Sequence, residues 1–387
     1  KIFLKVEHNI SRLKHLLKMY KLSVSEFLSK ISDGLKRPIS EKDVFSERIE
    51  IGHLKRIDKL FEKGIHYYLD PKAPENSKEA SVFFRKESFG TDLNFRAKKI
   101  VSQFEELKIS ISAISKLAEL DTKRKIPKFS IKDNPEKVAN EFRKILYPSF
   151  TSNRRDFLKA LISKFAESNI LVFEFVETHN RKEKANIDGF FLKPNVIVLK
   201  RHQSFRREIF TLAHELGHYL LNKEEIELLD YNVIADKHLS SIERWCNDFA
   251  YYFLVGEYGE MLKSIEPANA SNDYHFDLIK TVSENTHLSQ IALFTRLLFK
   301  NQISQSNYNK VRDDFEEQFK KFQEEKEREK ELQKEKGIKI RGSVAQPISS
   351  PLFISTIQAA FYEGIINEYD VCKKLNIKPE KLDKYIQ

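Results

Sequence analysis

Apolar residues recur at helical spacing along most of this chain, and three short apolar segments read as strands instead. Strands are predicted at residues 171–176, 189–192 and 195–199, where apolar, mostly β-branched or aromatic residues gather. Helices are predicted elsewhere, over residues 10–28 with a break near 21–23, 54–61, 97–120, 134–146, 205–221, 241–254, 288–298 and 311–336, and within 352–387. The pattern therefore predicts an α+β fold, mainly helical, with a small sheet and with helical N- and C-terminal parts.

Composition divides the predicted elements into six parts. Residues 1–70 are expected to form a basic helical domain, 71–133 a helical connector and 134–310 the domain that contains the strands. Residues 311–336 mix charges of both signs around Phe315, Phe319 and Phe322, which is typical of an exposed helix anchored at one end. Gly, Pro and Ser residues mark 337–351 as a linker before a helical segment at 352–387, which is expected to pack back on the rest of the chain or to bind a partner.

The predicted helix 205–221 contains the string His214-Glu215-Leu216-Gly217-His218. On a helix, residues four apart lie on one face, so His214 and His218 can bind one metal ion while Glu215 lies beside its open side. Such a string also occurs by chance, but residues 205–213 contain no Gly or Pro and support an uninterrupted helix. Gly217 costs a helix about 1 kcal/mol relative to Ala, so a strand or a substrate is expected to approach closely there.

A third ligand is expected from the predicted helix 241–254. Glu243 follows His218 by 25 residues and opens an apolar helix, where it can complete a His₂Glu set for Zn²⁺, although a first-turn glutamate also favours the helix dipole. Asn247, one turn later, can accept a hydrogen bond from the outer N–H of a ligand histidine. Four rivals for the third position lie in the polar connection, namely His238, Asp236, Glu224 and Glu225. The sequence leaves open whether Mn²⁺ replaces Zn²⁺.

Neither the cysteines nor the hydropathy point to export or to a membrane. Cys246 and Cys372 fall in separate predicted helices, so no disulfide framework is indicated, and Cys246 is expected to act as a small buried apolar side chain. The chain has no run of about 18 apolar residues, and it does not open with a signal sequence. We therefore expect a cytoplasmic protein with no membrane partner.

The net charge of +10 lies in the first third of the chain. Residues 1–133 hold 29 Lys and Arg against 19 Asp and Glu, whereas residues 134–387 hold 38 of each kind. Such an asymmetry favours an acidic partner for residues 1–133, nucleic acid being the commonest. Three interpretations stay open: sequence-specific DNA binding, non-specific contact with nucleic acid, and a structural helical domain with a solvated basic surface.

The two predicted helices around the metal motif resemble those of the ImmA/IrrE-type zinc metallopeptidases. The family reads approximately R-x-x-F-T-L-A-H-E-L-G-H and then E-x-x-A-N-x-F-A, and the chain departs from it at Cys246, where Ala is usual, and at 253–256. The resemblance implies a zincin-like peptidase domain at 134–310, with His214, His218 and Glu243 as zinc ligands and Glu215 as the catalytic base. The matching residues are Arg207, Phe210, Thr211, Leu212, Ala213 and the motif, followed by Glu243, Asn247, Phe249 and Ala250.

Residues 10–28 resemble the first two helices of helix-turn-helix repressors of the Cro/xenobiotic-response type, with Ser23 or Ser25 as the cap of the second helix. Residues 32–52 offer no clear recognition helix. The two resemblances together imply an endopeptidase that cleaves a helix-turn-helix repressor encoded nearby at one site, so that stress or mobile-element genes are released. Two alternatives are a DNA-binding or antitoxin-like regulator and a general zinc protease. The sequence does not rank the candidates for oxyanion stabilisation, which are Tyr219, Tyr251, Tyr252, His202 and His238.

Overall fold

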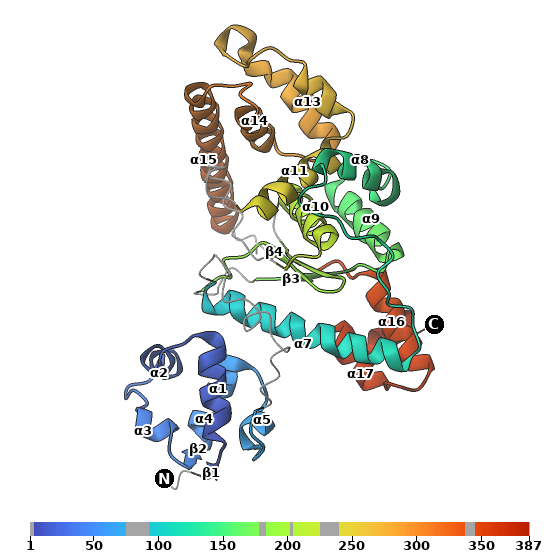
Figure 1. The fold of residues 1–387 in the computed structure, drawn as a ribbon. Helices are drawn as coiled ribbons and strands as arrows, with labels where there is room; N and C mark the ends of the chain where they lie inside the picture. The colour runs from blue at the N-terminus through green and yellow to red at the C-terminus, as the bar shows by residue number, and fades with distance from the viewer. Residues whose placement is uncertain are drawn as a thin grey trace. The chain divides into compact units, whose positions relative to one another are not determined.

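The computed structural model describes residues 4–74, 93–177, 183–201, 204–224, 240–336 and 345–386 (Figure 1). The chain separates into two compact units, residues 1–105 and 106–387. The structure is mostly helical with a small sheet, which confirms the predicted α+β class. Within the described ranges, no helix is both long enough and apolar enough to cross a bilayer.

The N-terminal unit is a small helical bundle with a two-stranded sheet. Its helices are α1 (Ile10–Tyr20), α2 (Val24–Ser32), α3 (Glu41–Val44), α4 (Ile51–Phe61) and α5 (Ile65–Leu69). β1 (Lys5–Glu7) pairs antiparallel with β2 (Arg48–Glu50). Lys21 adopts a left-handed conformation and ends α1, and Ser23 caps α2 in a capping box with Glu26. The predicted break is confirmed, and Ser23, not Ser25, is the cap.

The helix-turn-helix resemblance ends after α2. The segment in which a recognition helix was sought, residues 32–52, contains α3, a single turn of four residues closed by a capping box of Ser40 and Asp43. The other helical residues in that segment are Ser32, which ends α2, and the first two of α4, which begins at Ile51 and includes Gly52. A helix that reads a major groove presents several side chains from successive turns, and α3 is too short for this.

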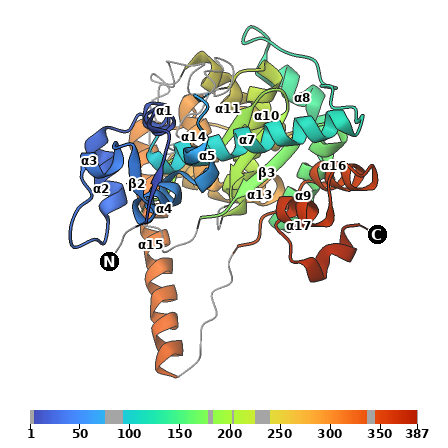
Figure 2. The ribbon, with the colours of Figure 1, turned by 90° about the horizontal axis from the view of Figure 1, so that it is seen from below.

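The second unit is built on a mixed three-stranded sheet in the order β3-β5-β4. β3 (Leu171–Phe175) runs parallel to β5 (Val196–Lys200), and β4 (Gly189–Leu192) runs antiparallel to β5 at the edge. α10 (Phe205–Leu221) contacts β4 and β5, and also α9 (Arg154–Glu167) and α11 (Ser241–Val255). α8 (Pro135–Leu146) packs on α11, and Figure 2 labels α8, α10 and α11 in the same part of the structure. One hydrophobic core joins these elements, so the sheet and α10 are held as one body.

The described residues after α11 are helical apart from their connections. They form α12 (Tyr258–Lys263), η2 (Ala270–His275), α13 (Phe276–Thr286), α14 (Gln290–Phe299), α15 (Gln305–Glu335), α16 (Pro351–Tyr362), α17 (Glu368–Leu375) and η3 (Pro379–Lys384). α7 (Phe95–Leu117) is the predicted connector helix. Each element matches a predicted helix or falls in a segment for which the sequence offered no prediction.

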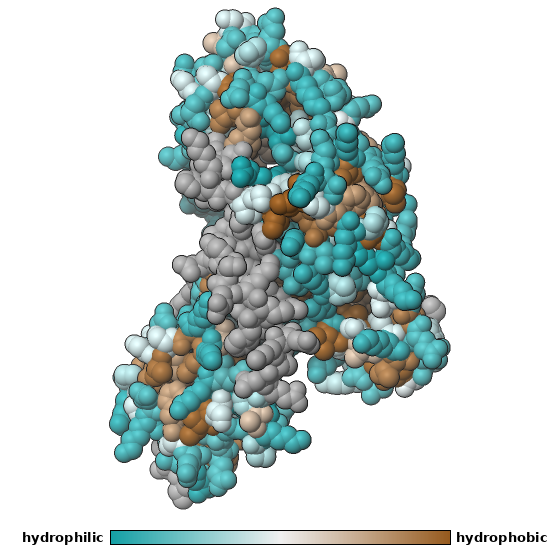
Figure 3. Space-filling model, viewed as in Figure 1, coloured by the Kyte–Doolittle hydropathy of each residue, from teal (hydrophilic) through white to brown (hydrophobic). Residues whose placement is uncertain are grey.

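The two ends of the charged helix α15 differ. Tyr308 and Val311 are buried, and Phe315 packs against Phe276 and Phe294, whereas Phe319 and Phe322 are exposed. The helix is therefore anchored at its first turns, as predicted, although it begins six residues before 311. Beyond the anchored turns it carries mostly charged side chains. Hydrophilic residues also cover much of the coloured surface in Figure 3.

The C-terminal segment packs on the second unit, as expected. The backbone N–H of Ile348 donates to Glu174 Oε2 at 2.6 Å, and Phe353 of α16 meets Phe173 of β3 with ring centroids 5.1 Å apart. α16 also lies against α9. Of the predicted linker 337–351, residues 337–344 lie outside the described residues.

Candidate metal centre

The helix α10 carries its motif on a fully buried stretch. Every residue from Thr211 to Leu221 is buried, because this part of the helix runs between the sheet and α11. His214 and His218 lie one turn apart with ring centroids separated by 4.8 Å. The exposed fractions of His214, Glu215 and His218 are 2%, 4% and 1%. Buried polar groups of this kind require partners, and α11 supplies them.

Glu243, in the first turn of α11, faces both histidines. Its Oε2 lies 3.0 Å from His214 Nε2, its Oε1 lies 3.1 Å from His218 Nε2, and the two Nε2 atoms are 3.0 Å apart. Ligand atoms around a tetrahedral zinc ion lie about 3.3 Å apart, given Zn–N and Zn–O bonds of about 2.0–2.2 Å. The three predicted ligands are therefore brought together at nearly the spacing that such an ion requires.

The chemistry of these atoms also fits a metal ion. His214 Nδ1 lies 2.9 Å from Asn247 Oδ1, which can only accept a hydrogen bond, so Nδ1 carries the proton. In a neutral imidazole the Nε2 lone pair then points at a carboxylate oxygen of Glu243. Two acceptors at 3.0 Å repel each other unless a proton or a metal ion lies between them. Asn247 thus orients His214 in the tautomer that a metal ligand needs, as the sequence predicted.

Burial and neighbouring charges shift the pKa values of the side chains in this cluster. Burial is the main cause that raises the pKa of Glu215 to about 7. The imidazoles of His218 and His214 act to lower this pKa, whereas the Glu243 carboxylate raises it further. Burial also acts to raise the pKa of Glu243, but His218 and His214 outweigh it and hold that pKa well below its usual range. For His218 burial is outweighed by Cys246 and Glu243, which raise its pKa. Glu243 therefore stays ionised beside the positive charge of the imidazoles. A bound metal ion would supply that positive charge in place of the imidazole protons.

Gly217 and Cys246 lie at the contact between α10 and α11. A Cβ on residue 217 would stand 3.1 Å from the Cα, Cβ and Sγ atoms of Cys246. The expected close approach is therefore real, but the expectation of a strand or a substrate is wrong, because the neighbour is a helix. Cys246 is fully buried, as predicted, and does not belong to the ligand cluster of His214, His218 and Glu243.

Among the four rivals for the third ligand, Glu224 is the one that the structure describes. Its Oε1 accepts a hydrogen bond from the backbone N–H of Lys193 at 2.7 Å, and it is not part of the ligand cluster. The other three, Glu225, Asp236 and His238, lie outside the described residues.

The structure describes three of the five candidates for oxyanion stabilisation. Tyr219 lies beneath the guanidinium of Arg124 at 3.8 Å, and Tyr251 and Tyr252 lie 4.5 and 5.1 Å from that of Arg296. None of these contacts connects a tyrosine to the ligand cluster. His202 and His238 lie outside the described residues.

Sequence reasoning missed two residues that place the edge strand β4 beside Glu215. A Cβ on Gly189 would stand 2.6 Å from Thr211 Cγ2 and 3.3 Å from Glu215 Cγ, so only glycine allows this approach. Asp188, directly before β4, binds the guanidinium of Arg207 through two nitrogens, Nε at 2.8 Å and Nη2. A glycine at the start of a strand was a visible signal for the first residue. No neighbouring sequence feature indicated that Asp188 binds Arg207.

Comparison with known proteins covers the part of the chain that holds this site. Residues 166–278 match the sequence model of a peptidase family described as the IrrE N-terminal-like domain. No curated protein sequence matches the chain. A solved structure of a Mycobacterium tuberculosis transcriptional regulator is similar over 42% of this chain and 46% of that chain, with 16% identity and a TM-score of 0.27. The chain thus spans about half of that regulator.

The match at 166–278 includes all three strands of the sheet and both helices that carry the cluster. It supports a peptidase-related or regulator-related role for this part of the chain. The segment that holds His214, Glu215, His218 and Glu243 is therefore similar to the IrrE N-terminal-like domain of a peptidase family.

Proposed function

We propose that this chain is a zinc-dependent endopeptidase whose metal ligands are His214, His218 and Glu243 and whose catalytic base is Glu215. The observation that carries the proposal is the buried cluster in which Glu243 lies 3.0 and 3.1 Å from the two histidines. The similarity of residues 166–278 to a peptidase family supports the same chemistry. A zinc ion, when bound, would polarise the substrate carbonyl and lower the pKa of water.

Glu215 performs the proton transfers in this proposal. Its Oε2 atom is buried and makes no hydrogen bond within the described part of the protein, and burial raises its pKa to about 7. It accepts a proton from the attacking water, whose oxygen bonds to the carbonyl carbon. As the C–N bond breaks, Glu215 delivers that proton to the leaving amine. A base whose pKa is close to neutral suits both steps.

The edge strand β4 is the proposed platform for the substrate backbone. β4 pairs with β5 along one side, and Gly189 brings its first residue against Glu215. An extended peptide can add to such an edge through main-chain hydrogen bonds, which a folded surface cannot do. The substrate would therefore be a linker or a locally unfolded segment of a protein. We propose a helix-turn-helix repressor as that protein, because the resemblance of the two motifs implies it.

Metal analysis of purified variants tests the ligand set. His214→Ala, His218→Ala and Glu243→Ala should each lose most of the bound zinc, because two remaining ligands hold the ion poorly. Glu215→Gln should retain zinc and abolish cleavage, since an amide does not accept the proton of water. Glu224→Gln is the matched control and should retain both zinc and activity. Full zinc occupancy in Glu243→Ala contradicts the assignment.

A cleavage assay tests the substrate. The protein is incubated with a repressor encoded beside its gene and, separately, with casein, and fragments are mapped by mass spectrometry. We expect one cut in the repressor, absent in Glu215→Gln, and little digestion of casein. Digestion of casein at many sites would support a general protease. Binding of an operator without cleavage of any protein would support a regulator.

A further inference from the structure

The N-terminal unit contains a cavity of about 510 Å³ between α1, α5 and the residues that follow α5. Its polar lining consists of Arg12, His15, Lys63, Tyr67, Asp70 and Lys72. These residues come from two short segments of the chain, 12–15 and 63–72, which both belong to the unit 1–105. The cavity is therefore a feature of this unit alone and does not involve the metal centre.

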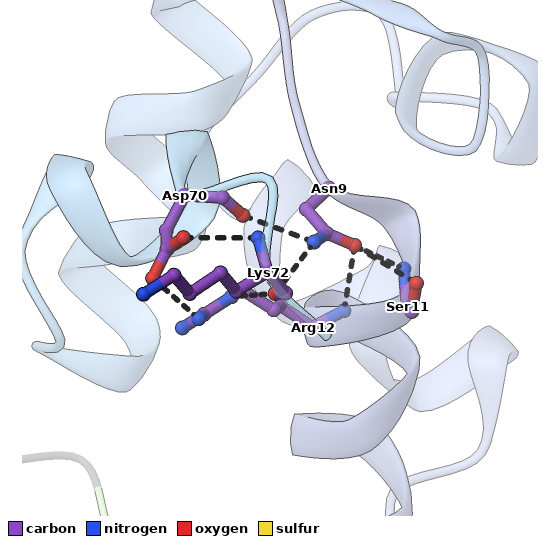
Figure 4. Close-up of polar contacts among 5 residues, drawn as sticks. All are labelled: Asn9, Ser11, Arg12, Asp70 and Lys72. Atoms are coloured by element: carbon purple, nitrogen blue, oxygen red, sulfur yellow. Dashed lines mark hydrogen bonds and ion pairs between the residues drawn. The ribbon is translucent and has the colours of Figure 1, made fainter. Parts of the chain in front are cut away.

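Its wall is held by a network of hydrogen bonds (Figure 4). Asn9 Nδ2 donates to the backbone oxygens of Asp70 and Lys72, both at 3.0 Å, and Arg12 Nε donates to the oxygen of Lys72 at 2.8 Å. Asp70 Oδ1 also accepts the N–H of Lys72 at 3.0 Å. The first turn of α1 thus fixes the backbone of residues 70–72, and the cationic residue Lys72 is part of a built wall.

Positive charge predominates around the cavity. Among the described residues that line it, Asp70 is the single acid, and its Oδ2 lies 2.5 Å from Arg12 Nη2. Lys63 and Lys72 add two further cations. The pKa of His15 is lowered by burial first and then by Lys18, Lys63 and Arg12, which shows that several cations act on one point of the lining. An anionic ligand would relieve this repulsion.

We infer that this cavity binds a nucleotide unit of single-stranded nucleic acid, with its phosphate held by Lys63, Lys72 and Arg12. The whole unit 1–105 holds 22 Lys and Arg against 15 Asp and Glu, a surplus that favours a long polyanion over an isolated phosphate. A flexible strand can place one nucleotide inside a cavity, whereas the backbone of a duplex is convex.

Two structural observations fit this ligand. The single-turn helix α3 does not serve as a recognition helix, so binding is expected to be independent of sequence. Tyr67 offers an aromatic ring in the lining, and the guanidinium of Arg12 already lies 4.9 Å from its centroid. An aromatic ring beside cationic side chains is the usual composition of a site for single strands.

Fluorescence anisotropy of the full chain with a labelled oligothymidylate tests the inference over a range of salt concentrations. The wild type should bind at low salt, with an affinity that falls steeply as salt rises. Lys63→Gln and Lys72→Gln should each weaken binding several-fold and lower the slope of log affinity against log salt by roughly one contact. Lys36→Gln removes the same charge from an exposed loop position outside the cavity and should leave both values unchanged.

Three results would overturn the inference. An equal loss in Lys36→Gln means that charge alone binds the strand and that the cavity is not the site. Tighter binding of a duplex of the same length rejects the assigned ligand, and absence of binding at low salt rejects the whole proposal. The melting temperature of each variant is measured first, and a lining variant that is destabilised is replaced by the corresponding Lys→Arg change, which should retain binding.

Discussion

Gly217 of α10 is in such close contact with Cys246 of α11 that a side chain on residue 217 would stand 3.1 Å from the Cα of Cys246. The next residue, His218, is a proposed metal ligand, and Glu243 lies one turn before Cys246. Because the two helices meet at a glycine, their backbones approach closely enough for Glu243 to reach both histidines at 3.0 and 3.1 Å. The glycine therefore contributes to the geometry of the cluster without being one of the proposed ligands.

Gly217→Ala should destabilise the second unit by about 1–3 kcal/mol, because the added methyl group overpacks the contact between α10 and α11. Zinc affinity should fall with it, since the helices must separate. Denaturant unfolding and metal titration measure the two effects. Gly52→Ala is the matched control, because nothing lies within 4 Å of the added Cβ in α4, and it should stabilise the N-terminal unit by up to about 1 kcal/mol. Unchanged stability in Gly217→Ala would contradict the packing argument.

Asn247→Ala should lower zinc affinity by about 10-fold to 100-fold, because His214 loses the partner that orients its ring and fixes its tautomer. Competition with a chromophoric chelator measures the affinity. Asn247→Asp keeps an acceptor at the same place and should restore much of it. Asn285→Ala, which removes an amide from the exposed surface of α13, should have no effect. An unaltered affinity in Asn247→Ala would show that the contact of 2.9 Å does not orient the ligand.

Removal of zinc should lower the melting temperature of the second unit and leave that of the N-terminal unit unchanged. An ion that binds only the folded state stabilises it by about 4 kcal/mol when its concentration is about 1,000 times the dissociation constant. Calorimetry with and without a chelator measures the difference. In His214→Ala the same transition should no longer respond to the chelator. A shift of the first unit instead would place the metal elsewhere.

His287 should make the stability of the second unit depend on pH. Burial is the main cause that lowers the pKa of its imidazole, and Arg154 and Arg206 lower it further. The hydrogen bond to the backbone oxygen of Thr151, at 2.8 Å, acts to raise the pKa but is outweighed. The unfolded chain takes up a proton near pH 6.5, whereas the folded chain does so only at lower pH. The stability that depends on neutral His287 is therefore fully present above about pH 6.5. It decreases as the pH falls below 6.5, by at most about 1.4 kcal/mol per pH unit.

Urea unfolding between neutral and mildly acidic pH checks this dependence. The free energy of unfolding should fall with acid in the wild type, and His287→Gln should remove that part of the slope while its amide N–H can still donate to the backbone oxygen of Thr151. His275→Gln is the control, because His275 is partly exposed and lies on η2. Identical slopes in the wild type and in His287→Gln would reject the assignment.

The sequence by itself determined the local features of this protein. The four-residue spacing of His214 and His218 places both rings on one face of a helix, and the caps at Ser23 and Asn134 follow from side chains that bond to backbone only a few residues away. The strands and most helix bounds followed from periodicity for the same reason. The asymmetry of charge between residues 1–133 and the rest is also a property of composition.

Only the tertiary structure decided which distant residues meet. It brought Glu243 to the two histidines and turned Glu224 toward Lys193, and it showed that Cys246 is the neighbour that requires Gly217. It likewise joined Arg12 to Asp70 across 58 residues in the wall of the N-terminal cavity. Hydrogen bonds within one or two turns leave a pattern in the sequence. Contacts across the fold depend on how whole helices pack, and no local spacing records that.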